Sequence, residues 1–300
     1  MRIYLKSFLL ILFTIGLFLI VSCAPEDYLS DSRVDRLGVH SEILEKTMFL
    51  EIYVPRGYGD SDVPVLYMLH DYAQNEKAIR DSEMFDLADI MIEQGMIEPM
   101  LIVSPQIDNS YLLNSSEKCL IHGNSHVTGL YSGRYEDYLT DEVMKYIEDS
   151  YNVVKDESGR FIGGISTGGY AALRMAFANP DMFSKVGGHM PAVWTPEMSL
   201  MEMDLLGWLY PTEASRLQRD PAALAYKNNL GNLEIYLDCG DKDNYSGPGV
   251  QNLYDTLVLL GYDCSLSVNE GKHNQEYISQ NIMEYLRFYA GIADDEGGNQ

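Results

Sequence analysis

Short apolar runs alternate with segments of helical periodicity along most of the chain. The runs are rich in β-branched and aromatic residues and are bounded by Gly, Pro, Asn or Asp, which is typical of buried strands. They predict strands at residues 47–54, 64–69, 100–105, 160–165, 185–190, 233–238 and 264–268. Apolar positions at helical spacing predict helices at residues 84–94, 135–150, 170–179, 250–260 and 275–291.

Strands that alternate with helices in this way indicate an α/β fold. Continuous apolar strands are typical of a mostly parallel sheet whose two faces are both covered by helices. The first strands precede any helix and are expected to form an antiparallel edge on the N-terminal side. No linker divides residues 37–292, so we expect a single domain there, followed by an acidic tail at residues 293–300.

The stretch from Met190 to Leu224 departs from this alternation. It contains four methionines, two tryptophans and Tyr210, and it follows a predicted strand. Methionine and aromatic side chains form adaptable apolar surfaces, so the stretch is interpreted either as a lid or wall of an acyl pocket or as an ordinary pair of packed helices. The sequence leaves both interpretations open.

The first residues have the pattern of a secretory signal. Arg2 and Lys6 precede an apolar run from Ser7 to Val21, which is short for a transmembrane helix of about 20 residues. The run ends in LIVSC, which resembles a bacterial lipobox. We therefore expect residues 1–22 to be removed, Cys23 to carry a lipid, and residues 23–36 to form a polar tether. The protein is then an exported lipoprotein of the bacterial cell envelope or surface; an ordinary secretory signal and an uncleaved anchor are the alternatives.

The charge of the chain limits its partners. There are 45 acidic and 21 basic residues, a formal net charge of −24. Loss of the two basic residues in the signal leaves 19 and brings the charge to −26. Such a surface repels phosphate backbones and anionic lipid headgroups. We therefore expect no nucleic-acid binding. Attachment to a membrane would have to come from the lipid and not from the charge of the protein.

Three cysteines remain beyond Cys23, namely Cys119, Cys239 and Cys264. An odd number argues against a full disulfide framework. Cys239 follows one predicted strand and Cys264 begins the next. In parallel neighbours these positions lie at opposite edges of the sheet, too far apart for a disulfide. We expect free thiols.

The segment FIGGISTGG places Ser166 at a junction that has no room for a loop. A predicted strand ends at Ile165 and a predicted helix begins at Tyr170. Gly164 and Gly168 complete the pattern G-x-S-x-G, in which a strained turn lifts the serine oxygen clear of the backbone. The helix N-terminus behind it presents free amides to a developing negative charge. We interpret Ser166 as a nucleophile; glycines required only for packing are the alternative.

A serine hydroxyl needs a base, and the base must be held by an acid. In folds with this elbow the serine, the acid and the histidine follow one another in that order. Only two of the six histidines, His189 and His273, follow Ser166. His189 lies on or at the end of a predicted strand, whereas His273 lies on a glycine-containing loop before the last helix. His273 is therefore the candidate base.

The candidate acids lie at the end of the strand LEIYLD and in the segment CGDKDNY. Asp238, Asp241 and Asp243 compete, and spacing alone does not choose between Asp241 and Asp243. The D-x-D-N run lacks the central glycine and the closing glutamate of an EF-hand loop, so we expect no metal. A triad of this kind needs no cofactor.

From about residue 40 to residue 289 the chain resembles the esterase D and feruloyl-esterase group of α/β-hydrolases. The resemblance rests on the motifs LEIYVPRGY, PVLYMLHD, RYEDYLTDEVMKYIEDSY, RFIGGISTGGYAALRMAF, NPDMF, IYLDCGDKD and EGKH. It implies the α/β-hydrolase fold and a serine esterase activity. Enterochelin esterases, S-formylglutathione hydrolases and mycolyltransferases belong to the same group.

The resemblance also assigns the remaining site residues. It selects Asp243 as the acid and the backbone amides of Thr167 and Tyr72 as oxyanion donors. One position departs from the group's pattern, because Asp71 stands where members typically carry glycine after the histidine. This substitution puts a carboxylate beside a site that has to stabilise a negative charge.

The expected function is that of an exported serine carboxylesterase acting on small-molecule or glycan esters, with acetyl or feruloyl groups of polysaccharides as candidate substituents. An acyltransferase with the same triad, a siderophore esterase and a non-catalytic surface-binding lipoprotein are the alternatives.

Overall fold

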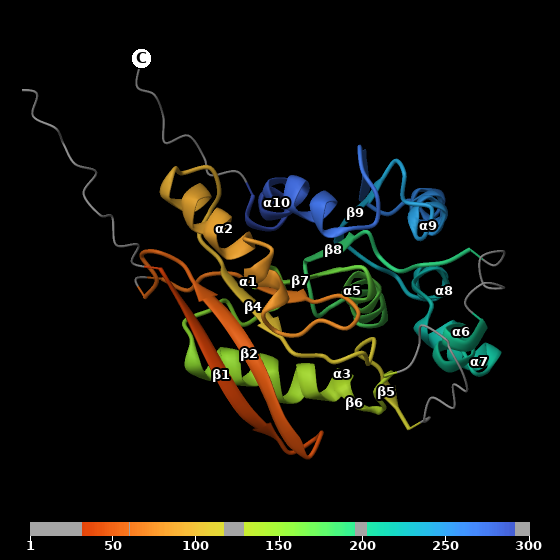
Figure 1. Cartoon of the computed structure of the whole chain (residues 1–300), viewed down its shortest axis with the longest axis horizontal. Helices are drawn as coiled ribbons and strands as arrows, with labels where there is room; N and C mark the ends of the chain where they lie inside the picture. Colours follow the sequence, from red (N-terminus) through yellow and green to blue (C-terminus); the bar gives the residue numbers. More distant parts are fainter. Residues whose placement is uncertain (1–31, 60, 117–128, 196–202, 292–300) are drawn as a thin grey trace, which may run out of the picture.

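The computed structural model describes residues 32–59, 61–116, 129–195 and 203–291. The predicted signal, Cys23, Cys119 and the acidic tail lie outside these residues. The centre of the fold is an eight-stranded sheet with the strand order β1-β2-β4-β3-β7-β8-β9-β10 (Figure 1). Its strands are β1 (Arg33–Ser41), β2 (Lys46–Val54), β3 (Val65–Leu69), β4 (Leu101–Pro105), β7 (Arg160–Ile165), β8 (Lys185–His189), β9 (Glu234–Gly240) and β10 (Cys264–Asn269).

The direction of the strands confirms the predicted architecture. β1 and β2 run antiparallel to each other, and β2 runs antiparallel to β4. All other neighbours in the sheet, from β4 to β10, are parallel. The antiparallel edge is therefore on the N-terminal side, and the carboxyl ends of the parallel strands share one edge of the sheet.

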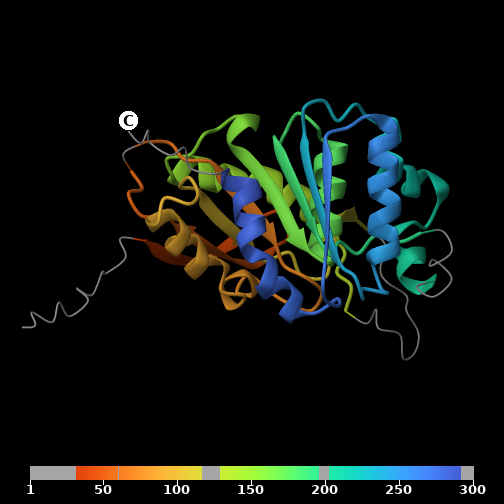
Figure 2. The same cartoon turned by 90° about the horizontal axis from the view of Figure 1, so that it is seen from above.

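Helices cover both faces of this sheet (Figures 1 and 2). One face is covered by α2 (Met84–Glu93) and α10 (Gln275–Ala290), and the other by α5 (Thr167–Ala178), α9 (Gly247–Leu260) and a helical segment over residues 135–150. That segment consists of α3 (Tyr135–Asp137), the π-helical η1 (Tyr138–Met144) and α4 (Lys145–Ser150). The smaller elements are α1 (Ala78–Asp81), the two-stranded β5 (Asn114–Ser115) and β6 (Gly133–Arg134), the 3₁₀ turn η2 (Glu157–Gly159), α6 (Met203–Leu209), α7 (Glu213–Arg219) and α8 (Pro221–Lys227).

The central strands are buried on both faces, which explains why their sequences are unbroken apolar runs. Every residue of β3 is buried. Successive side chains of a strand point to opposite faces, and β3 divides accordingly: Val65, Tyr67 and Leu69 join the core under α5, while Leu66 and Met68 join the core under α2 and α10. A strand with helices on both faces has no solvated side, so polar residues do not alternate along it.

The first strand of the sheet begins earlier in the chain than predicted. The predicted tether of residues 23–36 overlaps this strand, because β1 begins at Arg33 and pairs residue by residue with β2. Its side chains are mostly exposed or half-buried, because it is the last strand of the sheet and lacks a second neighbour. Such an edge strand carries charged residues and gives a weak apolar signal.

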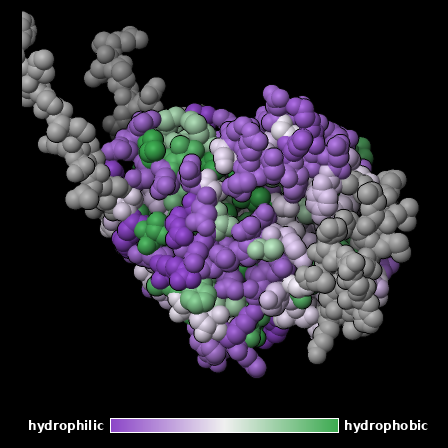
Figure 3. Space-filling model, in the orientation of Figure 1, coloured by the Kyte–Doolittle hydropathy of each residue, from purple (hydrophilic) through white to green (hydrophobic). Residues whose placement is uncertain are grey.

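The two cysteines among the described residues are free, as predicted. On the parallel strands β9 and β10, Cys239 is opposite Val268, and Cys264 is opposite Ile235. The sulfurs therefore belong to opposite ends of the strand pair. The face of the molecule seen in Figure 3 is mostly hydrophilic, with small separate apolar patches, in keeping with the excess of acidic residues.

Candidate active site

Ser166 occupies a strained turn between β7 and α5. Its backbone has φ 52° and ψ −110°, a region that side-chain-bearing residues rarely adopt. The turn is held on both sides: the Ser166 amide donates to His189 O at 2.9 Å, and the Ala192 amide donates to Ser166 O at 2.8 Å. The serine is thereby fixed at the carboxyl end of a central strand, at the start of a twelve-residue helix.

The flanking glycines are required by close backbone contacts. A Cβ on Gly164 would lie 2.3 Å from the carbonyl carbon of Gly168. A Cβ on Gly168 would lie 2.4 Å from Leu69 O and 2.5 Å from His70 O. The pattern G-x-S-x-G is thus a steric requirement of packing α5 against β7 and the end of β3, as well as of the turn itself.

Three side chains from loops far apart in the sequence meet at this turn. His273 Nε2 lies 2.9 Å from Ser166 Oγ, and His273 Nδ1 lies 2.9 Å from Asp243 Oδ2. Ser166 follows β7, Asp243 follows β9 and His273 follows β10, so all three stand at the edge where the parallel strands end. This is the geometry of a nucleophile, a base and an orienting acid.

Asp243 is buried and fully surrounded by donors. Its Oδ1 accepts hydrogen bonds from the amides of Tyr245 and Ser246, both at 2.9 Å. Its Oδ2 accepts from the Ser246 hydroxyl at 2.7 Å in addition to the His273 ring. Burial raises the pKa of Asp243, but the hydrogen bonds from His273 and Ser246 outweigh it and lower that pKa to about 2. The carboxylate is therefore ionised at neutral pH.

The rival candidates occupy other positions. Asp238 and His189 are completely buried and bind each other, with Nδ1 of the ring 2.9 Å from Oδ1 of the carboxylate. His189 Nε2 is also paired, 2.9 Å from Tyr289 OH. Asp241 is exposed and accepts from the Gly271 amide at 2.9 Å. Neither aspartate is bonded to His273 in the way Asp243 is.

The predicted oxyanion donors lie beside the elbow. Thr167 is the first residue of α5, so its amide is one of those that a helix leaves without an internal partner. Tyr72 lies in the loop after β3, and this loop is anchored by His70, whose Nδ1 is 2.9 Å from Asp71 O and whose Nε2 accepts from the Ile107 amide at 3.0 Å. Burial lowers the pKa of His70, in agreement with a neutral ring. The donor roles of Thr167 and Tyr72 stay predictions.

Asp71 does not require the conformational freedom of the glycine it replaces. Among the residues after β3, the left-handed conformation is taken by Ala73, at φ 61°, and not by Asp71. The Asp71 carboxyl is half-buried. Burial raises its pKa to about 6, an effect that its own backbone amide and the charge of His273 partly oppose. The carboxyl therefore stands within electrostatic reach of the candidate base.

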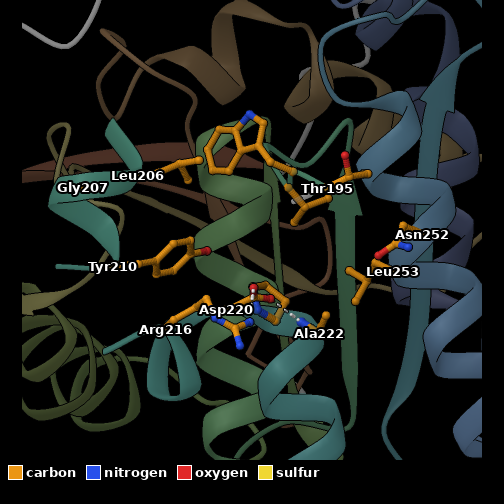
Figure 4. Close-up of a pocket in the computed structure, with 13 residues that line it drawn as sticks. Thr195, Leu206, Gly207, Tyr210, Arg216, Asp220, Ala222, Asn252 and Leu253 are labelled. Carbon is orange, nitrogen blue, oxygen red and sulfur yellow. Dashed lines mark hydrogen bonds and ion pairs between the residues drawn. The ribbon is translucent and has the colours of Figure 1, made fainter. Parts of the chain in front are cut away.

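The stretch 190–224 contributes side chains both to the main core and to the wall of a cavity, and its role as a lid or acyl pocket stays a prediction. Trp208 and Leu209 of α6 are buried in the main core. Other residues of the stretch line a cavity of about 560 Å³ between α6–α8 and α9 (Figure 4). Its walls are formed by Val193, Trp194, Thr195, Leu206, Gly207, Tyr210, Arg216, Asp220, Pro221, Ala222, Gly249, Asn252 and Leu253. Residues 196–202 lie outside the described part of the chain.

The cavity lies next to the triad without including it. The rings of Trp194 and Tyr245 are 6.3 Å apart, and the rings of Tyr245 and His273 are 5.1 Å apart, both edge to face. In Figure 4, Leu206 and Tyr210 face Leu253 across the cavity, and Arg216 and Asp220 lie at one end. The apolar and aromatic walls with a few polar groups are typical of a site for a small organic group.

Sequence reasoning missed Ser246 and the buried pair of His189 and Asp238. The run D-N-Y-S offered one signal for Ser246, since an aspartate commonly binds backbone amides two or three residues further on. No sequence pattern indicated that the Ser246 hydroxyl would contact both Asp243 and His273. Among the residues that the structure describes, no group of three or more His, Cys, Asp or Glu side chains could hold a metal ion, and no helix is long and apolar enough to cross a membrane.

The mostly parallel sheet, the helices on both faces and the serine elbow define an α/β-hydrolase fold. Residues 41–258 match the family described as "Putative esterase", and the chain therefore belongs to this family. The family match includes Ser166 and Asp243 and ends before His273.

Known proteins similar to this chain carry related names. An "Endo-1,4-beta-xylanase/feruloyl esterase" from Xylanibacter ruminicola is 23% identical over 266 residues, which cover 86% of this chain and 31% of that protein. The structure of a ferulic acid esterase has a TM-score of 0.71 at 21% identity, covering 87% of this chain and 98% of the other. An S-formylglutathione hydrolase from Agrobacterium tumefaciens has a TM-score of 0.70 at 18% identity, covering 87% and 96%. The two structural likenesses show the shared fold.

Proposed function

We propose that this protein hydrolyses ester substituents of polysaccharides through a triad of Ser166, His273 and Asp243. The observation that carries the proposal is the pair of 2.9 Å contacts that join Ser166 Oγ to His273 Nε2 and His273 Nδ1 to Asp243 Oδ2. An unactivated serine hydroxyl is a poor nucleophile, and this chain of contacts supplies the base and the acid that it needs.

The reaction proceeds in two halves. In the first, Ser166 Oγ attacks the ester carbonyl while His273 Nε2 takes its proton, and the same proton then passes to the leaving alcohol. In the second, His273 takes a proton from water, the resulting hydroxide attacks the acyl-serine, and Ser166 regains its proton as the acid leaves. Asp243 holds the imidazole with Nε2 towards Ser166 in both halves.

The negative charge of the tetrahedral intermediate falls on the former carbonyl oxygen. The amide of Thr167, at the N-terminus of α5, is one proposed donor, and the amide of Tyr72 is the other. One such donor is worth roughly 2.7–4 kcal/mol of transition-state stabilisation. The Ala73 amide is already engaged, since it donates to Asn109 Oδ1 at 2.7 Å.

Two observations support polysaccharide esters as the substrate class. One is the likeness to a protein described as both a xylanase and a feruloyl esterase. The other is the cavity of about 560 Å³ beside the triad, whose aromatic walls suit a group bulkier than acetyl. A feruloyl group linked to a sugar hydroxyl meets both conditions.

We also propose that the protein is exported and attached to a membrane by a lipid on Cys23. The apolar run that ends in LIVSC supports this proposal. A position outside the cytoplasm would bring the esterase to polymers that do not enter the cell.

The substrate is tested by comparing p-nitrophenyl acetate, methyl ferulate and acetylated xylan, with Ser166→Ala as the control for contaminating activity. We expect methyl ferulate to be hydrolysed with the highest kcat/KM. Turnover of p-nitrophenyl acetate alone would support the esterase chemistry and contradict the feruloyl assignment. Equal activity in Ser166→Ala would contradict the triad.

A further inference from the structure

Ser246 lies at the junction between the candidate acid and the candidate base. It follows Asp243 by three residues and is completely buried. Its Oγ lies 2.7 Å from Asp243 Oδ2 and 3.2 Å from His273 Nδ1. The same Oδ2 is 2.9 Å from Nδ1, so the three atoms form a closed triangle of hydrogen-bonding groups.

The protons can be placed on this triangle. A hydroxyl has one proton to donate and two lone pairs that accept. Asp243 is ionised and can only accept, so the Ser246 proton points to Oδ2. A lone pair of Ser246 Oγ is then left for His273 Nδ1–H, which gains a second acceptor beside the carboxylate. This arrangement favours the tautomer that keeps the proton on Nδ1 and leaves Nε2 open towards Ser166 Oγ.

The position of Ser246 at the start of a helix shows that its hydroxyl is not there to cap the helix. Ser246 is the N-cap of α9, where a serine side chain ordinarily accepts a bond from the first amides of the helix. Here it makes no such capping bond, and its hydroxyl is turned to the acid and the base instead. The Ser246 hydroxyl therefore makes no capping hydrogen bond to α9, but it contacts both the candidate acid and the candidate base.

We propose that Ser246 is a positioning residue of the esterase, whose hydroxyl fixes both the Asp243 carboxylate and the His273 ring in the orientation needed for catalysis. The inference rests on the proposed triad. It predicts that the hydroxyl acts on the chemical step and leaves the substrate-binding surface unchanged.

The test is the pair of variants Ser246→Ala and Ser246→Thr. In Ser246→Ala the amides of Ser246 and Tyr245 still hold Asp243 Oδ1, so the acid stays in place and the ring loses one of its two supports. We expect kcat to fall roughly 10- to 100-fold with KM unchanged, by analogy with the range seen when the hydrogen-bond partner that orients a metal-binding histidine is removed. Ser246→Thr keeps the hydroxyl and is expected to recover most of kcat.

Ser82→Ala is the matched control. Ser82 is also buried, between α1 and α2, and its hydroxyl donates to Ile79 O at 2.7 Å instead of to a triad residue. We expect it to lower the unfolding temperature by about as much as Ser246→Ala while leaving kcat unchanged. The control separates the loss of one buried hydrogen bond from the loss of a contact to the triad.

A spectroscopic measurement decides the question if the extra methyl group of threonine prevents folding. The NMR resonance of the His273 Nδ1 proton reports its hydrogen-bond partners directly. We expect this resonance to shift in Ser246→Ala and to stay in place in Ser82→Ala.

The inference is overturned if Ser246→Ala keeps the wild-type kcat while Ser166→Ala is inactive. It is also overturned if the alanine and threonine variants, both folded, lose kcat equally, because packing and not the hydroxyl would then be responsible. Activity in Ser166→Ala would instead contradict the triad itself, so the two failures are distinguishable.

Discussion

His273 Nε2 lies 2.9 Å from Ser166 Oγ although the two residues are 107 positions apart in the sequence. They meet because β7 and β10 are parallel members of one sheet, and each residue stands in the loop that follows its strand. Asp243, after β9, reaches the same edge. In open α/β sheets the edge at the carboxyl ends of the strands is the usual place for a functional site.

Loss of the nucleophile is the first prediction. We expect Ser166→Ala to lower kcat by roughly 10⁶-fold, as for removal of the serine in serine proteases. The unfolding temperature is expected to stay close to that of the wild type, because the side chain contributes little packing. Steady-state hydrolysis of p-nitrophenyl acetate and thermal unfolding measure the two effects, and wild-type turnover by this variant would contradict the assignment of Ser166.

The second prediction separates the two aspartates of the loop after β9. Asp243→Asn presents an amide to Nδ1 and favours the wrong imidazole tautomer, so we expect kcat to fall by roughly 10⁴-fold. Asp241→Asn is the matched control, because Asp241 is exposed and binds the Gly271 amide instead of the ring. The reverse ranking of the two variants would make Asp241 the acid.

Features of a fold can be predicted from the sequence where one strong physical requirement determines the residue type. The turn around Ser166 is predictable because contacts of 2.3–2.5 Å with neighbouring backbone atoms leave no space for a side chain at Gly164 and Gly168. The seven strands were found because each must be apolar where helices cover it, as every residue of β3 shows. His273 followed from chain order and from its place on a loop.

The features that cannot be predicted from the sequence depend on contacts between residues that are distant in it. The start of β1 resembles a polar tether in sequence because an edge strand needs few apolar residues. Asp243 was chosen by the family resemblance, since the two loop aspartates differ only in what surrounds them in space. Ser246 contacts His273, which is 27 positions away, and such a contact produces no recognisable pattern in the sequence around either residue.

The third prediction concerns the buried pair beneath the elbow. His189→Ala removes one partner of a completely buried carboxylate, whose other oxygen keeps the hydrogen bond from Tyr285 OH at 2.8 Å, and we expect the free energy of unfolding to fall by about 3 kcal/mol. Turnover per folded molecule should stay within a few-fold of wild type, since the residue supports Ser166 through its backbone carbonyl. Chemical denaturation and active-site titration measure these quantities, with the exposed His40→Ala as control. A stable but inactive His189→Ala would make His189 the base.

The fourth prediction is the modification of Cys23. We expect mass spectrometry of protein produced in a bacterial host to find a lipid on Cys23 at the mature N-terminus, and fractionation to place the protein with membranes. Cys23→Ala should release it from the membrane fraction without changing kcat, because the triad lies more than a hundred positions further along. An unmodified N-terminus beyond Cys23 in soluble protein would contradict the lipoprotein assignment.

The fifth prediction is a pH dependence that comes from Asp71. Burial raises the pKa of its carboxyl from 3.8 to about 6, so the folded enzyme carries an additional negative charge beside His273 only above that pH. If the oxyanion lies between the amides of Thr167 and Tyr72 as proposed, this charge on the neighbouring residue opposes it in the transition state. We therefore expect Asp71→Asn to have nearly the wild-type kcat/KM at pH 5 and a higher kcat/KM at pH 8, with the ratio of variant to wild type rising through about pH 6.

The same shift in pKa links Asp71 to stability. The folded protein binds this proton more tightly than the unfolded chain does, so ionisation disfavours the folded state as the pH rises from about 4 to 6, and the loss persists at higher pH. Asp71→Asn removes the ionisation. Its unfolding temperature should exceed that of the wild type more at pH 8 than at pH 4. Ratios of activity and differences in unfolding temperature that do not change with pH would show that the Asp71 carboxyl does not titrate in this range, and would remove it from the electrostatics of the site.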